Sequence, residues 1–154
     1  MPLWRTASSN GLCQPFLPRR LWNECLTEIP LISIVDDDEA VCAATGSLVR
    51  SLGFATREFL SAESFLRSSA VSETQCLILD VQMPNMSGVE LQSHLSSLGF
   101  DIPIIFMTAF PDEAVRARVL DGGAVDFLHK REMHGQRFID SLHAALERRK
   151  RSAL

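Results

Sequence analysis

The sequence has little of what marks a membrane protein, a disulfide-rich protein or a nucleic-acid binder. None of its apolar stretches approaches the roughly 18 residues of a membrane span, so we expect no membrane partner. Its 4 cysteines are scattered without a C-x-x-C pair, which favours reduced thiols in the cytoplasm over disulfides or a zinc site. The net charge of −4 argues against direct nucleic-acid binding, because proteins that bind nucleic acid usually carry a basic face.

The amino-terminal stretch, residues 1–28, also lacks a clean targeting signal. It contains no apolar core of about 7–15 residues, which excludes a secretory signal peptide. Its prolines, serines and glycine follow no period, so we expect a disordered N-terminal extension, while its arginines leave an organelle transit peptide open as an alternative. The remaining length and the hydrophobic content of 46% suffice for one domain with a full core, over residues 29–148, before a basic tail at 149–154.

Five short apolar runs predict β-strands, at residues 31–35, 54–59, 77–80, 102–107 and 124–129. A polar linker occupies 68–74, and apolar residues recur at helical spacing in 41–52, 62–66, 91–98, 112–121 and 138–146. The apolar phase of 112–121 is blurred. Strands that alternate with helices indicate parallel β-α-β units with right-handed crossovers. We therefore predict an α/β fold: a single doubly wound five-stranded parallel sheet with helices on both faces, whose strand order the pattern leaves open.

Polar residues stand where four of these strands end, namely Asp36, Asp37, Asp80, Thr108 and Lys130. Because the carboxyl ends of parallel strands meet at one rim, we expect these side chains to converge. Three carboxylates would repel one another, and Mg²⁺, which prefers oxygen ligands, would relieve that repulsion. A lysine charge and a threonine hydroxyl then complete a site for a phosphoryl group, which Asp80 is placed to accept as a nucleophile. Taken singly, Lys130 also fits an ion pair with an acid, and Thr108 also fits a helix cap.

Four motifs carry a resemblance to a known family: V-D-D-D-E at 35–39, L-D-V-Q-M-P-N-M-S-G at 79–88, M-T-A at 107–109 and G-A-V-D-F-L-H-K at 123–130. With these motifs, residues 31 to about 148 resemble the receiver domain of two-component response regulators. The sequence at 79–88 and 122–128 is most similar to that of receivers of nitrogen-fixation-type transcriptional regulators, which usually precede a helix-turn-helix output domain. The resemblance implies the flavodoxin-like receiver topology.

The resemblance also implies a phosphoacceptor and a metal site. Asp80 would accept a phosphoryl group from a sensor histidine kinase in a Mg²⁺-dependent reaction. Asp37 and Asp80 would bind Mg²⁺ directly, together with the backbone carbonyl of Gln82. Asp36 would assist through water.

Three further residues would couple the phosphoryl group to the rest of the domain. Thr108 would hydrogen-bond a phosphoryl oxygen, and Lys130 would pair with it. Phe127, three residues before the lysine, would be the switch aromatic, although an ordinary core phenylalanine fits this position too. Phosphorylation would then alter partner binding or homodimerisation through the face of the fourth helix, fifth strand and last helix, with a downstream protein or a missing output domain as the partner. The chain would be a switch that takes part in its own phosphorylation and dephosphorylation, and not an enzyme.

Two other functions compete with this prediction. A pseudo-receiver would bind partners without phosphorylation, but the intact set of acids, threonine and lysine argues against it. A Mg²⁺-dependent hydrolase with an aspartyl-phosphate intermediate would need D-x-D, and Asp80-Val81-Gln82 lacks the second acid. The basic run at 148–151 could suggest nucleic-acid contact, but it is more typical of a solvated helix end, where positive charge is favourable.

Two features depart from the receiver pattern. Arg131 stands where a proline, often in a cis peptide, usually follows the lysine. A cis bond before a non-proline residue costs about 2.5–4 kcal/mol, so we predict a trans bond and a differently shaped loop. The sequence also ends at Leu154, which implies either a stand-alone receiver or a regulator whose output domain has been removed.

Overall fold

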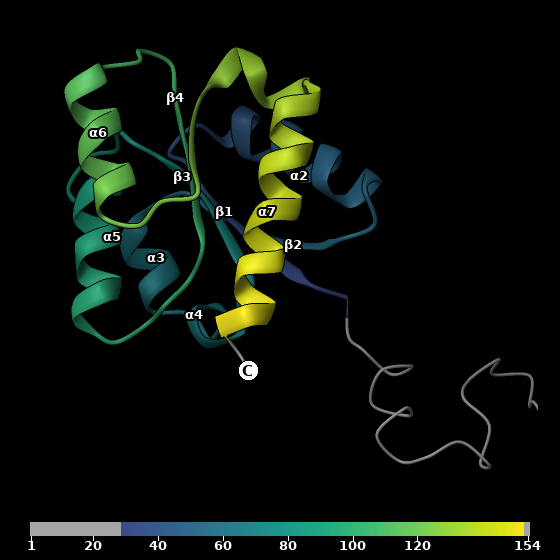
Figure 1. The fold of residues 1–154 in the computed structure, drawn as a ribbon, viewed down its shortest axis with the longest axis horizontal. Helices are drawn as coiled ribbons and strands as arrows, with labels where there is room; N and C mark the ends of the chain where they lie inside the picture. Colours follow the sequence, from purple (N-terminus) through teal and green to yellow (C-terminus); the bar gives the residue numbers. More distant parts are fainter. Residues whose placement is uncertain (1–28, 153–154) are drawn as a thin grey trace, which may run out of the picture.

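One sheet of five parallel strands forms the middle layer of the fold (Figure 1). The computed structural model describes residues 29–152, so the predictions for residues 1–28 lie outside the described residues. The strands are β1 (Leu31–Val35), β2 (Ala55–Phe59), β3 (Cys76–Asp80), β4 (Ile104–Thr108) and β5 (Asp126–His129). Their order is β2-β1-β3-β4-β5 and each neighbouring pair is parallel, which confirms the predicted sheet and its flavodoxin-like topology.

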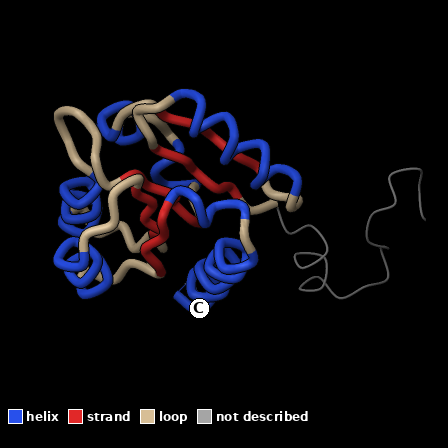
Figure 2. Tube along the Cα trace, turned by 90° about the horizontal axis from the view of Figure 1, so that it is seen from above, coloured by secondary structure: helices blue, strands red, loops and turns tan. Residues whose placement is uncertain are grey.

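Helices cover both faces of this sheet, as predicted (Figure 2). They are α2 (Glu39–Ser51), α3 (Ala62–Leu66), α4 (Ala70–Glu73), α5 (Gly88–Ser97), α6 (Glu113–Asp121) and α7 (Gln136–Ser152), with a 3-10 helix, η2, at Lys130–His134. The apolar side chains of α2 and α7 pack on one face, and those of α3 to α6 pack on the other. Between the two layers, all residues of β3 are buried, which explains its continuous apolar run. Within 29–152, no helix combines the length and the apolar character needed to span a bilayer.

Several segments differ from the prediction. The linker at 68–74 contains α4, whose Ala70 and Val71 are buried in the core. The fourth and fifth strands begin later than predicted, at 104 and 126. Pro103 has no N–H for a strand ladder, and the Ala124 N–H instead bonds back to the last turn of α6.

The carboxyl-terminal part differs in a similar way. Helix α7 continues to Ser152, so residues 149–152 belong to this helix and not to a separate tail. The peptide bonds of the described residues are all trans, as predicted before Arg131, and the loop at this position is the 3-10 helix η2.

Candidate functional site

Three carboxylates gather at the carboxyl end of the sheet. Asp36 follows β1 and Asp80 ends β3, and these strands are parallel neighbours with Val35 opposite Leu79. Residues 36 and 80 therefore lie side by side at the rim. Asp36, Asp37 and Asp80 each offer a carboxylate oxygen within 4.8 Å of the others, so the structure brings these three predicted site residues together. Asp36 and Asp80 are buried, whereas Asp37 is exposed.

The third consecutive acid of this stretch, Asp38, belongs to helix α2. Its carboxylate accepts hydrogen bonds from the N–H groups of Ala40, at 2.9 Å, and Val41, at 3.4 Å, and so caps the helix. The Asp38 N–H in turn donates to Asp36 Oδ1 at 2.9 Å. Asp38 is therefore a natural control for substitutions at Asp37, because it is an adjacent acid with a structural task.

Lys130 enters the cluster from the end of β5. Its Nζ lies 2.8 Å from Asp36 Oδ2 and 3.5 Å from Asp80 Oδ2. The ion pair with Lys130 is the contact that the structure gives to the buried Asp36 Oδ2. Burial by itself would lower the pKa of Lys130, but the contacts with Asp36 and Asp80 outweigh it and raise that pKa. The lysine is therefore held in its charged form.

The cluster carries more negative than positive charge. Burial raises the pKa of Asp80 well above its usual range, and the negative charge of Asp36 raises it further. The positive charge of Lys130 offsets part of this shift. Three carboxylates meet here, and Lys130 is the one cation paired with them among the described residues. This donor set suits a hard divalent cation such as Mg²⁺, which prefers carboxylate, carbonyl and water oxygens.

The loop from β3 to α5 adjoins Asp80 on another side. The Gln82 N–H lies 3.4 Å from Asp80 Oδ1, so the residue whose carbonyl was predicted to bind the metal is next to the acid. A Cβ atom at Gly88 would lie 2.1 Å from the Asp80 backbone oxygen, so a side chain at this position would clash with the backbone of β3. This close approach was not predicted from the sequence. The available signal was a glycine directly after Ser87, which caps α5.

Thr108 is the last residue of β4, and Phe127 lies within β5. The buried Thr108 hydroxyl donates to Phe110 O at 3.2 Å and accepts from Phe110 N at 3.1 Å. Phe110 itself is 75% exposed. Phe127 lies opposite Phe106 in the sheet and is 4% exposed, within the core. The ring predicted to be the switch aromatic is therefore buried in this structure.

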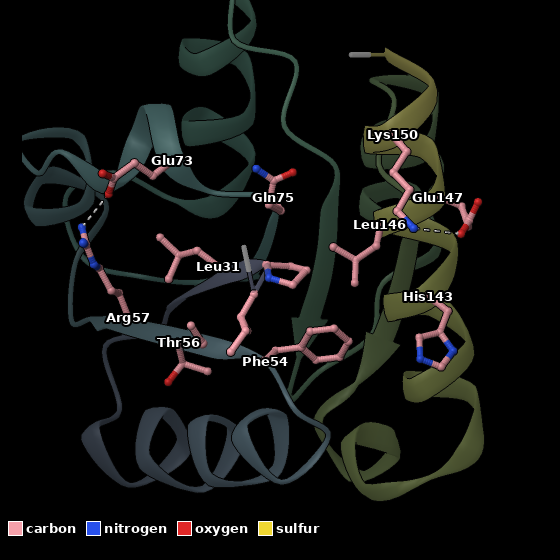
Figure 3. Close-up of a pocket in the computed structure, with 13 residues that line it drawn as sticks. Leu31, Phe54, Thr56, Arg57, Glu73, Gln75, His143, Leu146, Glu147 and Lys150 are labelled. Atoms are coloured by element: carbon pink, nitrogen blue, oxygen red, sulfur yellow. Dashed lines mark ion pairs between the residues drawn. The ribbon is translucent and has the colours of Figure 1, made fainter. Parts of the chain in front are cut away.

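A hollow lies at the opposite, amino end of the strands (Figure 3). Its volume is about 790 Å³, and its apolar wall includes Leu31, Phe54 and Leu146. The charged groups at its rim form the ion pairs Arg57–Glu73 at 3.1 Å and Lys150–Glu147 at 3.7 Å. These charges neutralise one another and do not converge on one point, so the acids at the carboxyl end remain the better candidate for chemistry.

The sequence of this chain is similar to a known protein family and to several known proteins. The family model described as response regulator receiver domain matches residues 32–143. Response regulator protein TodT of Pseudomonas putida is 43% identical over 117 residues, which cover 76% of this chain and 51% of TodT. Nodulation protein W of Bradyrhizobium diazoefficiens is 40% identical over 118 residues, which cover 77% of this chain and 52% of that protein.

Solved structures agree with these sequence matches. The crystal structure of FixJ-N has a TM-score of 0.69 at 32% identity, and the match covers 79% of this chain and 96% of that chain. The chain spans about half the length of the curated relatives it matches.

Proposed function

The chain belongs to the response regulator receiver domain family, and we propose that it is a phosphorylation switch whose phosphoacceptor is Asp80. The observation that carries this proposal is the meeting of Asp80, two further acids and Lys130 at one rim of the sheet. A sensor histidine kinase supplies the phosphoryl group. A carboxylate oxygen of Asp80 attacks phosphorus, the bond from phosphorus to the kinase histidine breaks, and an acyl phosphate remains on the receiver.

The residues around Asp80 each have a part in this transfer. Mg²⁺, when bound, neutralises charge on the transferring oxygens. Asp37, Asp80 and the Gln82 carbonyl would hold it, and Asp36 would assist through water. Lys130 is already charged and in contact with Asp80, so it is positioned to pair with the incoming phosphoryl oxygens.

Thr108 connects the phosphoryl group to the rest of the domain. Its hydroxyl donates to Phe110 O at 3.2 Å in this structure. After phosphorylation the hydroxyl donates to a phosphoryl oxygen instead. The loop that holds the exposed Phe110 is thereby released and rearranges with α6, which begins shortly after it. Phe127 of β5 belongs to the same core cluster as Val119 of α6, so a shift of α6 changes the surroundings of its ring.

The output surface is the face formed by α6, β5 and α7. Its partner is a downstream protein, an output domain or, after phosphorylation, a second copy of this chain. Direct nucleic-acid contact through the basic end of α7 is disfavoured, because Arg148 and Arg149 are occupied by Asp101 and Gly123. A cytoplasmic location is supported by the described cysteines, Cys42 and Cys76, which are free thiols.

The decisive experiment treats the protein with acetyl phosphate and measures its intact mass. We expect one phosphoryl adduct that requires Mg²⁺ and is lost when the metal is chelated. Asp80→Asn should abolish the adduct, and Asp37→Ala should reduce it strongly by removing a metal ligand. Asp38→Ala, the neighbouring helix cap, should still form it. An equal adduct in wild type and Asp80→Asn would show that Asp80 is not the acceptor.

The switch can be tested separately with beryllium fluoride, which mimics the phosphoryl group. We expect NMR signals of residues 108–131 to shift more than those of residues 54–70. Thr108→Ala should remove most of these remote shifts while signals around Asp80 still respond. Remote shifts that survive in Thr108→Ala would mean that the coupling does not run through the hydroxyl.

A further inference from the structure

The backbone on both sides of Lys130 is held by two hydrogen bonds. The Arg131 N–H donates to His129 Nδ1 at 3.0 Å, and the His129 N–H donates to Glu132 Oε2 at 2.8 Å. This arrangement is of the capping-box type: the residue before a helix accepts from an N–H of the first turn, and an acid in that turn accepts from the N–H of the residue before the helix. Lys130 is the residue between the two halves of this box.

The capping box provides an acceptor for the backbone N–H of Arg131. A proline at this position would have no N–H and a fixed φ, whereas Arg131 introduces a backbone donor and greater freedom. The imidazole of His129 supplies the acceptor for that donor. Glu132 is itself steadied by Arg137, whose guanidinium lies 3.5 Å from Glu132 and 3.0 Å from Asp126. The box is therefore fixed to both α7 and β5.

The position of the Lys130 backbone limits which groups its ammonium can reach. Its ammonium sits at the end of a flexible four-carbon stem and must contact both Asp36, at 2.8 Å, and Asp80, at 3.5 Å. We propose that His129 is a positioning residue for Lys130, acting through the Arg131 N–H in a capping box with Glu132 that takes the place of the proline usual in receivers. This inference rests on the proposed phosphoryl transfer to Asp80.

The test compares phosphorylation rates of variants of the full chain, using acetyl phosphate with Mg²⁺ and intact-mass detection. His129→Ala should slow the reaction by about fivefold to tenfold, the size expected for the loss of a capping acceptor. His129→Asn should stay within about twofold of wild type, because asparagine accepts the same type of backbone bond. His134→Ala, an exposed histidine of the same 3-10 helix, is the matched control and should leave the rate unchanged.

Binding measurements separate positioning from a general structural effect. His129→Ala should weaken beryllium fluoride binding while Mg²⁺ affinity, measured by calorimetry, stays within about twofold, since Lys130 pairs with the phosphoryl group and not with the metal. Glu132→Ala, with Glu132→Gln as its conservative partner, tests the other half of the box independently. Glu132→Ala should slow phosphorylation, and Glu132→Gln, which keeps an acceptor oxygen, should retain most of the rate.

Three results would overturn the inference: a wild-type rate in His129→Ala, an equal loss in His129→Asn and His129→Ala, or a parallel fall in Mg²⁺ affinity. If the wild type forms no adduct, the proposed function fails and this inference fails with it. If the wild type forms the adduct and His129→Ala matches it, the inference alone is wrong.

Discussion

Helices α6 and α7 pack on opposite faces of the sheet beside β5, but they are attached to it very differently (Figure 1). Ion pairs hold α7 at both ends, between Arg137 and Asp126 at 3.0 Å and between Arg148 and Asp101 at 3.4 Å. Helix α6 buries Val119 alone among its residues. Helix α7 buries Phe138, Ser141, Leu142 and Ala145.

A single buried hydrogen bond provides the second attachment of α6. Gln92 of α5 donates its amide N–H to the Val119 backbone oxygen at 3.0 Å. With so few buried contacts, α6 can shift at a small cost in free energy, whereas α7 forms part of the fixed frame. Because α6 follows the loop of Thr108, the loosely attached helix is also the one closest in sequence to the proposed phosphoryl contact.

The largest difference should appear when the main apolar anchor of each helix is truncated. Phe138→Ala should lower the free energy of unfolding by about 3–5 kcal/mol, because it empties a fully buried site. Val119→Ala removes less volume and should cost about 1–2 kcal/mol. Urea unfolding followed by circular dichroism measures both values. Equal losses would mean that α6 is as firmly embedded as α7.

A smaller effect is expected when the amide of Gln92 is removed. Gln92→Ala should cost about 1 kcal/mol, since it deletes one buried hydrogen bond. Hydrogen exchange should become faster in α6 and remain unchanged in α7. Gln136→Ala, an exposed glutamine in α7, serves as the control. Exchange that accelerates equally in both helices would contradict a local role for Gln92.

The smallest effect concerns the ion pair at the start of α7 and depends on pH. Burial favours a higher pKa for Asp126, but the hydrogen bonds from Ser141 and Arg137 prevail and hold that pKa below its ordinary value. A lowered folded-state pKa stabilises the protein above the unfolded-state value, about 3.9, and this contribution is lost as pH falls through the folded-state pKa.

Asp126→Asn should therefore lower stability at pH 7 by less than about 1 kcal/mol, because Arg137 is half exposed. The difference from wild type should shrink below about pH 4, as urea unfolding at several pH values would show. Asp140→Asn, which changes an exposed acid of α7, is the control. A difference that persists unchanged at low pH would exclude the carboxylate of Asp126 as its source.

Much of the fold follows from periodicity, and much of the rim follows from the rule that parallel strands end together. The short apolar runs predicted five strands, and their terminal acids predicted the meeting of residues 36, 37 and 80. The apolar phase of residues 112–121 is blurred, and in the structure Val119 alone is buried in α6. These features are local in sequence, so a pattern can record them.

The features that escaped prediction depend on contacts between distant residues. Gln92 lies on an amphipathic helix, where a polar side chain is normally assigned to the exposed side, and its partner is 27 residues away. Helix α4 is only 4 residues long, which is too short for a helical period to be visible. The capping function of His129 was not predicted, because His129 lies within the G-A-V-D-F-L-H-K motif and was assigned to the fifth strand. Its spacing to Glu132 nevertheless matches a capping box.

The groove at the amino end of the strands has a consequence for anything joined to this domain. Ile29 and Lys150 both line it, so the described chain begins and ends at the same pole of the molecule. The acids lie at the other pole, one strand length away, which is roughly 16 Å for five residues. A tag or a fused domain joined near either of these residues would therefore be attached at the pole opposite the acids. To respond to the occupancy of the acids, it would have to contact an element that reaches from one pole to the other, such as α7.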